Sequence, residues 1–485
     1  MKALIFLVLL ILSFDALSEC IIKNSNNTKA TKKHDPLYLV LEQLSSCPSN
    51  IRDFRDRLIN QGFTVEPTMV ANRGRHNPKL GSFSFFESVS GDTLSRGSFF
   101  FGHFIDADNN ILLPSNGQLV IEAIAWDAKK ELFNFYELVN QGNKIRWFYR
   151  GDSLDILADN TYLYRERPIN TPLFGNRMRC SACHISGGPI MKELYAPHND
   201  WWSHKRQLIF MPNRPSREIT YTINQLIDAE EFSSHIVTGI NLLEKSLVYQ
   251  KARHELELQE LLRPLFCETE VNLQSDLSSN EQSSNLITIP SEFFVNSLLA
   301  SDNFVISRSN YNILLDKFSM NFPETSHKDA DHAWLTPVKG HSDYVAIRAL
   351  ITNNIIDENF ALSSLSVDLG NPILSPQRCA LLKLVPSYSA DWRSQFINNL
   401  ENSNLDAARI LARSLAMPDP KEFAQTIAQA YVAEVKEKLK EIAGQEEFFA
   451  QLIRTRANVF ASEISQNPRG QILEPGFRVI FPVPN

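Results

Sequence analysis

The chain has 485 residues, with 48 Lys and Arg against 55 Asp and Glu, so its formal net charge is −7 and its pI is near 5.9. This mildly acidic balance lacks the basic excess that binding to a phosphate backbone requires, and nucleic acid is not expected as a partner. The length exceeds one typical hydrophobic core and predicts two or three domains.

Residues 1–18 have the pattern of a secretory signal peptide. Lys2 supplies a cationic start, residues 3–14 form a short apolar core, and Ala16-Leu17-Ser18 is a small-x-small cleavage signal. We therefore expect export to the bacterial periplasm, with the mature chain beginning near Glu19. Cys20 leaves open a lipid anchor, although a small residue usually precedes a lipid-modified cysteine. No later stretch is apolar over the length of a bilayer, so no transmembrane segment is expected after signal removal.

Residues 35–160 are predicted to form an α/β region with an antiparallel sheet. Asp35-Pro36 is typical of a helix start, and a second helix is predicted from Ser49 to about Gln61. From Gly81 to Arg150 the hydrophobic period changes to two, which is the period of a strand. The pattern predicts about five strands, near residues 83–85, 99–104, 120–124, 133–136 and 145–149.

A Cys-x-x-Cys-His run lies at residues 180–184. In this arrangement two thiols on one short turn can each add to a haem vinyl group, while the adjacent histidine binds the iron. Two alternatives remain open for Cys180 and Cys183. One is half of a zinc site, although no second Cys-x-x-Cys exists to complete it. The other is a dithiol redox motif, although such motifs follow a strand directly and here the flank is polar and basic.

Residues 236–485 are predicted to be mainly helical, with no assignable role. The helical period already begins at residue 223, before this region, and its longest run covers residues 240–266. The predicted helices are 223–232, 240–266, 341–351, 390–400 and 419–439. Residues 268–287 are rich in Ser, Asn and Gln and are predicted to form an exposed loop.

Four cysteines remain once Cys180 and Cys183 are assigned to haem, an even number in an exported chain. Proximity in the sequence favours pairing Cys20 with Cys47 and Cys267 with Cys379. Buried free thiols are the alternative, because sequence alone cannot choose among pairings.

Residues 161–235 resemble the haem domain of c-type cytochromes. The resemblance rests on Cys180, Cys183 and His184, followed by Gly187-Gly188 and, further on, Met211-Pro212. It implies a small helical segment that carries electrons with one covalently attached haem c. Cys180 and Cys183 would hold the haem, His184 would be its axial ligand, and Met211 would be the distal axial ligand.

The expected fold class is therefore α+β, mainly α. It comprises a β-rich N-terminal region with an antiparallel sheet, a small helical cytochrome c-like haem segment, and a helical C-terminal region.

The sixth haem ligand has candidates other than Met211. Met191 follows a flexible Gly-Gly-Pro turn, and His198 and His204 flank two tryptophans, Trp201 and Trp202, that are expected to cover the haem edge. Each of these side chains also has an ordinary structural explanation, as a core methionine or a solvated histidine.

Two further groups of residues have less specific patterns. Arg177 and Arg179 lie where their guanidinium groups could meet haem propionates, or they could be solvated. His327, Asp331, His332 and His341 could supply metal ligands or acid and base groups, but their spacing matches no standard metal site and favours a solvated loop.

Two functions from different classes follow from the sequence. The leading hypothesis is an exported monohaem cytochrome that passes electrons to an unidentified redox partner protein. The alternative is a periplasmic haem enzyme with an open distal site, acting on peroxide or oxygen, because simple electron carriers rarely need some 400 further residues. Whether the chain is an enzyme is left undecided, with electron transfer favoured.

Overall fold

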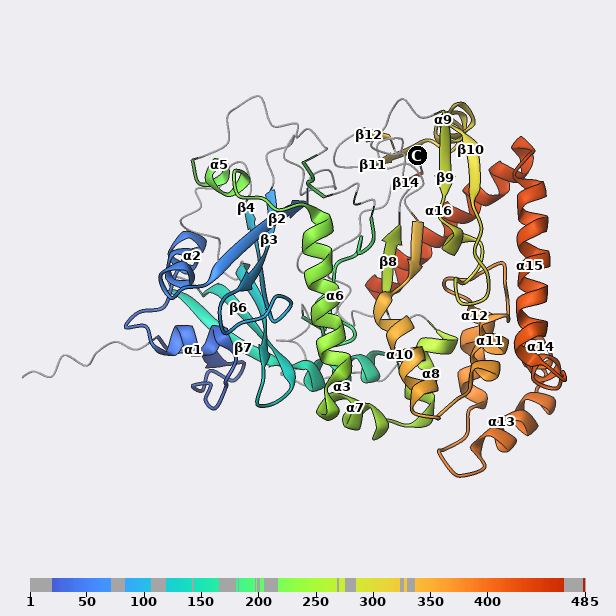
Figure 1. Cartoon of the computed structure of the whole chain (residues 1–485), viewed down its shortest axis with the longest axis horizontal. Coiled ribbons are helices and arrows are strands. Elements are labelled where there is room, and N and C mark those ends of the chain that lie inside the picture. The colour runs from blue at the N-terminus through green and yellow to red at the C-terminus, as the bar shows by residue number, and fades with distance from the viewer. Residues whose placement is uncertain are drawn as a thin grey trace, which may run out of the picture.

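The structure, a computed structural model, describes residues 20–70, 83–105, 119–141, 144–164, 180–181, 183–196, 198, 201–204, 217–267, 270–274, 285–322, 327–328, 336–465 and 483–484. Its N-terminal part is built on one large sheet and its C-terminal part is mainly helical (Figure 1). This arrangement agrees with the α+β class and with the β-rich and helical regions predicted from the sequence.

The large sheet has seven strands in the order β1-β7-β6-β5-β4-β3-β2. Neighbours from β2 to β7 pair antiparallel, as predicted, and β1 pairs parallel with β7. The strands are β1 (Lys23–Asn24), β2 (Thr64–Val70), β3 (Phe83–Ser90), β4 (Phe99–Ile105), β5 (Leu119–Asp127), β6 (Leu132–Gln141) and β7 (Lys144–Asp152).

The sheet has two more strands than the hydrophobic pattern predicts, namely β1 and β2. Pro67 interrupts the alternating pattern of β2, because proline cannot donate a ladder hydrogen bond. It is tolerated there because β2 is the edge strand. The carbonyl oxygen of Pro67 instead accepts a hydrogen bond from the Ile227 amide at 2.8 Å.

One face of the sheet is covered by α1 (Pro36–Glu42) and α2 (Ile51–Asn60), both at predicted positions. Asp35 caps α1 by accepting from the Tyr38 amide, and the same carboxylate accepts from Asn134 Nδ2 at 2.7 Å and from the Tyr136 hydroxyl at 2.5 Å. The capping residue therefore also fixes α1 on the sheet.

A buried ionic cluster lies on the same face. Glu87 from β3 accepts from the ring of His103 on β4 at 2.8 Å and lies 2.9 Å from Nε of Arg55 on α2. Arg55 also donates to the hydroxyl of Thr222, at 2.8 Å, on α5 (Arg217–Ile223). Burial lowers the pKa of His103, so its ring is neutral and Arg55 is the cation that balances Glu87.

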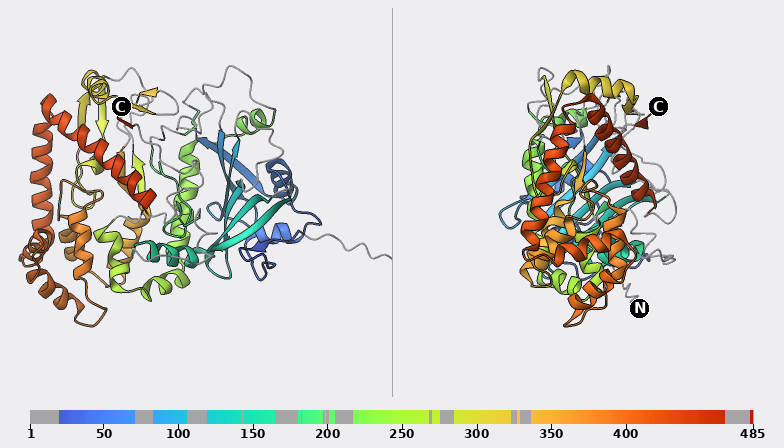
Figure 2. Two further views of the ribbon diagram at one scale, coloured as in Figure 1. Left: turned by 180° about the vertical axis from the view of Figure 1, so that it is seen from behind. Right: turned by 90° about the vertical axis from the view of Figure 1, so that its right-hand side faces the viewer.

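The other face of the sheet is covered by α6 (Ala229–Lys245) and by the described residues within the range 180–204. Phe232 of α6 packs edge to face on Phe100 at 5.9 Å. The backbone of α6 approaches closely at Gly239, where a Cβ atom would lie 2.6 Å from Pro189 and 2.7 Å from the Gly97 carbonyl oxygen. Figure 1 shows α6 standing between the sheet and the helical region, and Figure 2 shows the same from behind.

The C-terminal region forms the largest hydrophobic cluster, from Leu258 to Leu452. Its helices are α8 (Leu258–Phe266), α9 (Arg308–Lys317), α10 (His341–Thr352), α11 (Glu358–Leu365), α12 (Pro376–Ala380), α13 (Trp392–Glu401), α14 (Asp406–Leu415), α15 (Pro420–Lys438) and α16 (Ile442–Ser465). Its strands are β8 (Val271–Gln274), β9 (Leu286–Ile289), β10 (Phe304–Ser307), β11 (Met320–Phe322), β12 (His327–Lys328), β13 (Thr336–Lys339) and β14 (Val483–Pro484), with 3-10 turns η2 (Ser291–Phe293) and η4 (Leu381–Leu384). Helices α10, α13 and α15 confirm three predictions.

Two helix predictions are wrong. The predicted helix 223–232 is interrupted between α5 and α6, because the Ile227 amide pairs with β2 instead of continuing the helix. The predicted run 240–266 is divided into α6, α7 (Leu247–His254) and α8. Ser246 causes the first of these breaks, since its hydroxyl accepts from the Tyr249 amide at 3.0 Å and caps a new helix.

Both disulfides favoured from the sequence are present, Cys20–Cys47 and Cys267–Cys379. The first closes a separation of 27 residues beside α1, and the second closes 112 residues within the helical region.

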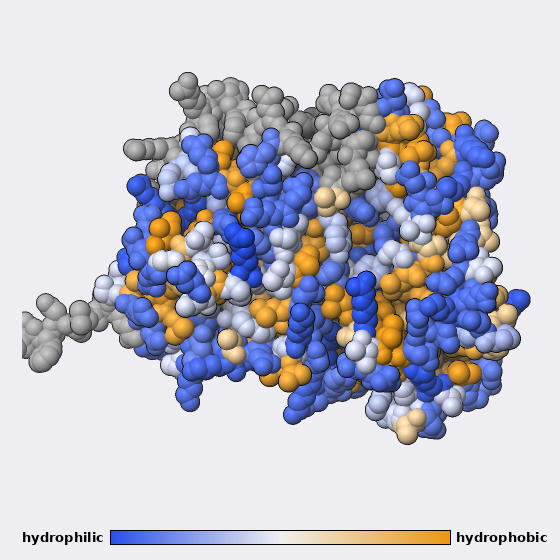
Figure 3. Space-filling view, viewed as in Figure 1, coloured by the Kyte–Doolittle hydropathy of each residue, from blue (hydrophilic) through white to orange (hydrophobic). Residues whose placement is uncertain are grey.

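The surface mixes hydrophilic and hydrophobic residues on the face shown in Figure 3. The most exposed apolar side chains, Leu247, Tyr388 and Tyr221, come from different parts of the chain. Single apolar residues on a surface are normal in folded proteins. Among the described residues, none of the helices combines the length and apolar character needed to cross a membrane.

The cluster around Glu87 gives a stability prediction. Replacing Glu87 with Gln leaves the Arg55 charge buried without its anion, which should lower the free energy of unfolding by about 3–5 kcal/mol. Urea unfolding measures this loss. Asp53→Asn on the same helix is the matched control, because its ion pair with Arg57 is partly exposed and should contribute less than about 1 kcal/mol. Equal effects of the two substitutions would contradict the prediction.

Candidate functional site

Four residues of the Cys-x-x-Cys-His run are described, namely Cys180, Ser181, Cys183 and His184. Cys180, Ser181 and Cys183 are helical, and the His184 amide donates to the Cys180 carbonyl oxygen at 2.8 Å. Residues three and four positions apart lie on the same face of a helical turn. Cys180, Cys183 and His184 therefore share one face of this turn.

The two thiols of this turn are the cysteines that form no disulfide. Cys180 is buried, and burial raises the pKa of its thiol well above the usual value; Glu137 adds to the shift and Arg150 opposes it. A thiolate is the species that binds zinc or attacks a disulfide, and such cysteines have lowered pKa values. The buried Cys180 thiol therefore lacks the lowered pKa that is typical of a reactive dithiol motif.

His184 has one ring nitrogen occupied. Its Nδ1 lies 2.7 Å from the Gly188 carbonyl oxygen, so this nitrogen carries the proton and donates. The lone pair of Nε2 is then available, which is the usual state of a metal-binding histidine. Burial lowers the pKa of His184 to about 4, with a further small contribution from Lys192, so the ring is neutral at pH 7. The ring also packs edge to face on Phe135 of β6, at 5.2 Å.

The chain after His184 is held tightly against the first turn of α3 (Ser153–Tyr164). Gly187 has φ +79°, and a Cβ atom there would lie 2.7 Å from the Ser153 carbonyl oxygen. The Ser153 hydroxyl donates to the Gly187 carbonyl at 2.8 Å, and the Tyr249 hydroxyl donates to the Ser186 carbonyl at 2.5 Å. At position 187 only glycine fits without strain.

Met191 lies in the hydrophobic cluster that also contains Cys180 and Leu194. Its side chain is 2% exposed, and its carbonyl oxygen accepts from Asn272 Nδ2 at 3.0 Å. These contacts give Met191 a role in the core near the turn at residues 180–184.

The two histidines that flank the tryptophans have different surroundings. His198 is buried, with Nε2 3.1 Å from the Leu194 carbonyl oxygen and Nδ1 4.0 Å from Glu230, and burial lowers its pKa. His204 is exposed and pairs with Asp228 at 2.9 Å. His204 is thus a solvated residue, whereas the Nδ1 of His198 is buried and has no hydrogen-bond partner within the described part of the chain.

The tryptophans pack on the sheet and its helical cover. Trp201 lies between Phe86 of β3, at 5.5 Å, and Phe232 of α6, at 6.2 Å. Trp202 contacts the ring of His204 at 4.6 Å. The packing of Trp201 accounts for its burial without a cofactor.

Several predicted site residues lie outside the described residues, namely Met211, Arg177, Arg179, Asp331 and His332. His327 lies in strand β12. His341 begins α10, and its ring pairs with the Tyr195 hydroxyl. This contact places His341 against the segment that follows residue 184.

Sequence reasoning missed Glu270, which lies beside the segment that follows His184. One oxygen accepts from the Ser342 hydroxyl at 3.0 Å and from the Ser186 hydroxyl at 3.5 Å. The other oxygen is buried and has no hydrogen-bond partner among the described residues. Burial raises the pKa of Glu270 to about 7; Asp343 also raises it, and Lys192 opposes the shift.

The prediction of an exposed loop at 268–287 is wrong at residues 270–274. Glu270, Asn272 and Leu273 are 0–1% exposed, and β8 pairs with β13. The alternation of Val271 and Leu273 with polar residues was the available signal, because a two-residue period indicates a strand.

Comparison with protein-family models, with curated proteins and with solved structures finds no match to this chain. Within the described ranges, no group of three or more His, Cys, Asp or Glu side chains is arranged to hold a metal ion. The function is therefore inferred from the geometry of residues 180–184 and their surroundings.

Glu270 gives a prediction about pH. Its folded pKa of about 7 exceeds the ordinary 4.5, so the folded chain binds this proton more tightly than the unfolded chain. Its contribution to stability is complete below about pH 4.5 and is lost as pH rises through about 7, by about 3 kcal/mol in total. Glu270→Gln should remove this loss.

Urea unfolding of parent and variant at about pH 5 and about pH 8 measures the difference. Glu260→Gln is the control, because Glu260 is also buried but is paired with Arg263. An unchanged gap between parent and Glu270→Gln at the two pH values would contradict the prediction.

Proposed function

We propose that this protein is an exported monohaem c-type cytochrome that carries electrons. The carrying observation is the turn at 180–184, which presents the two unbridged thiols and a neutral imidazole whose Nδ1 is already occupied. Cys180 and Cys183 would hold one haem c covalently, and His184 Nε2 would bind its iron. A haem bound there supplies reversible one-electron transfer.

The surroundings of the turn support this role. The Gly188 carbonyl fixes the tautomer of His184, and Phe135 fixes the orientation of the ring. Cys180 is buried in an apolar cluster with Phe133 and Phe135, which excludes water from one side of the turn. A rigid, dry environment reduces the reorganisation that accompanies a change of charge.

The two disulfides support export. Cys20–Cys47 and Cys267–Cys379 use all the cysteines outside the motif, and such bonds persist in oxidising compartments. We therefore propose that residues 1–18 direct the chain to the periplasm, the compartment where haem is attached to c-type cytochromes. There a redox partner protein would exchange electrons with it.

A haem enzyme with an open distal site is the second candidate, and Glu270 is the observation that favours it. A general acid or base works best when its pKa lies near the working pH. Glu270 meets this condition and has one unpaired oxygen near the turn. An electron carrier has no need for such a group.

Covalent attachment is tested by removing the thiols. Cys180→Ala with Cys183→Ala, expressed with the full leader in a host that matures c-type cytochromes, should give no haem-stained band on denaturing gels of the periplasmic fraction. Cys20→Ala with Cys47→Ala also removes two cysteines, those of a disulfide outside the motif, and should keep the band. Staining that survives the first pair of substitutions, or no staining of the parent, would refute the proposal.

The distal ligand separates the two candidate functions. If Met211 binds the iron, the oxidised protein shows the weak sulfur-to-iron charge-transfer band in the far red and binds carbon monoxide slowly when reduced. Met211→Ala should remove the band and accelerate binding. Met191→Leu is the control, because it nearly conserves core volume and should keep the band.

Other results would assign the site differently. Loss of the band in Met191→Leu but not in Met211→Ala would assign the ligand to Met191. A parent that lacks the band and binds carbon monoxide rapidly would favour the haem enzyme.

A further inference from the structure

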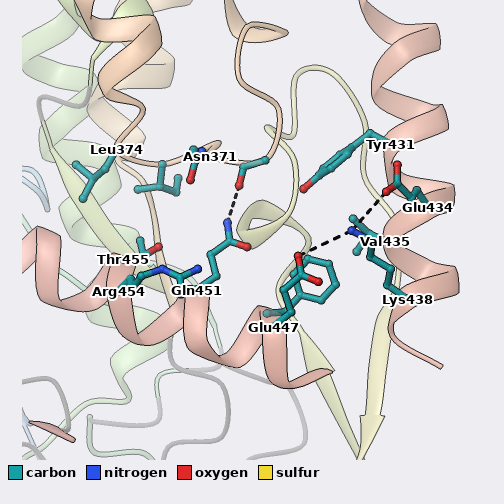
Figure 4. Close-up of a pocket in the computed structure, with 13 residues that line it drawn as sticks. Asn371, Leu374, Tyr431, Glu434, Val435, Lys438, Glu447, Gln451, Arg454 and Thr455 are labelled. Carbon is teal, nitrogen blue, oxygen red and sulfur yellow. Dashed lines mark hydrogen bonds and ion pairs between the residues drawn. The ribbon is translucent and has the colours of Figure 1, made fainter. Parts of the chain in front are cut away.

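A polar pocket of about 400 Å³ lies in the helical region, between α15, α16 and the loop 366–375 (Figure 4). This volume lies in the range of small-molecule sites. The pocket is lined by residues from the ranges 370–374 and 431–455. None of them belongs to the turn at residues 180–184, so the pocket requires a separate explanation.

The loop that forms one wall is held rigidly. Arg378 is 1% exposed and donates to the carbonyl oxygens of Val367, at 3.3 Å, and Pro372, at 2.9 Å. Asp368 and Leu374 have φ of +59° and +53°, a region that residues with a Cβ adopt at a cost. Strain of this kind is found at ligand-binding loops more often than elsewhere.

The opposite wall is one face of α16. Glu447, Gln451 and Arg454 are spaced by four and three residues, so their side chains project from the same face. Figure 4 shows them side by side below Asn371, with the Tyr431 hydroxyl turned toward the space above them. Seven residues of helix separate Glu447 from Arg454, which is about 10 Å along the axis.

One end of the pocket has an excess of negative charge. Lys438 lies 3.4 Å from Glu434 and 3.8 Å from Glu447, so one cation serves two carboxylates. Burial and these same carboxylates raise the pKa of Tyr431 to about 12, so its hydroxyl keeps its proton at pH 7. This end suits an ammonium group.

The other end has an unpaired cation. Arg454 is exposed and makes no hydrogen bond or ion pair within the part of the chain that the structure describes. Its neighbour Thr455 also lines the pocket. A guanidinium group binds a carboxylate through two parallel hydrogen bonds, so this end suits a carboxylate.

We propose that this pocket binds a short peptide with free termini, about three residues long. An extended chain spans about 3.3–3.6 Å per residue, so three residues match the 10 Å between the charged ends. The peptide carboxylate pairs with Arg454, and the peptide ammonium group pairs with Glu447, whose contact with Lys438 is the longer of the two at 3.8 Å.

Amide side chains can bind the backbone of such a peptide between its ends. Gln451 Nε2 donates to the Gly370 carbonyl at 2.5 Å, and Asn371 Nδ2 donates to Asp368 at 2.9 Å. Both amide oxygens therefore remain as acceptors for peptide N–H groups.

Isothermal titration calorimetry on the full mature chain tests the proposal, with trialanine, its N-acetyl derivative and its C-terminal amide as probes. We expect trialanine to bind, and each blocked form to bind about tenfold more weakly because one charged contact is lost. Arg454→Gln should weaken trialanine to the level of its amide while leaving the affinity of the amide unchanged.

Arg409→Gln, which replaces an exposed arginine on α14, is the matched control and should leave all three affinities unchanged. Three outcomes would overturn the proposal. These are no heat with trialanine at millimolar concentration, equal affinity for the blocked peptides, or an equal loss for trialanine and its amide in Arg454→Gln.

Discussion

The structure depends on how residues 184–195 are paired where they lie between the sheet and the helical region. This segment has little regular structure, so most of its peptide groups do not satisfy one another and would destabilise the fold if buried unpaired. Side chains from both parts provide the partners. Ser153 and Tyr249 bind the carbonyls of Gly187 and Ser186, and Asn272 binds that of Met191.

This pairing makes the helical region part of the candidate haem site. The Leu273 amide donates to the Lys192 carbonyl, so β8 joins the segment that follows His184. Ser186 and Ser342 donate to the same oxygen of Glu270 from opposite sides. A haem attached at 180–184 would therefore be held by a frame that neither part of the chain supplies alone. The large size of the protein is consistent with that requirement.

Local patterns predicted the parts of the fold that local chemistry determines. The cap at Asp35, the alternating strands and the turn spacing of Cys180 and His184 need only neighbouring residues, and the structure has them in place. The break at Ser246 and the burial of Glu270 were not predictable in the same way. The first depends on a cap that overrides a continuous apolar period, and the second on a strand partner more than sixty residues away.

Glu270 also bears on the choice between the two candidate functions. Burying a carboxyl group with one oxygen unpaired destabilises a fold, and an apolar residue of similar size would avoid this. The hydroxyl donors to its other oxygen come from residues 186 and 342. The carboxyl group is therefore held between the segment after His184 and the helical region, and is not a surface side chain that happens to be covered. Its pKa near 7 means that small changes in nearby charge would change its protonation. A group that exchanges a proton near pH 7 has a direct chemical use beside a centre that acts on a substrate, which is what the haem-enzyme candidate requires.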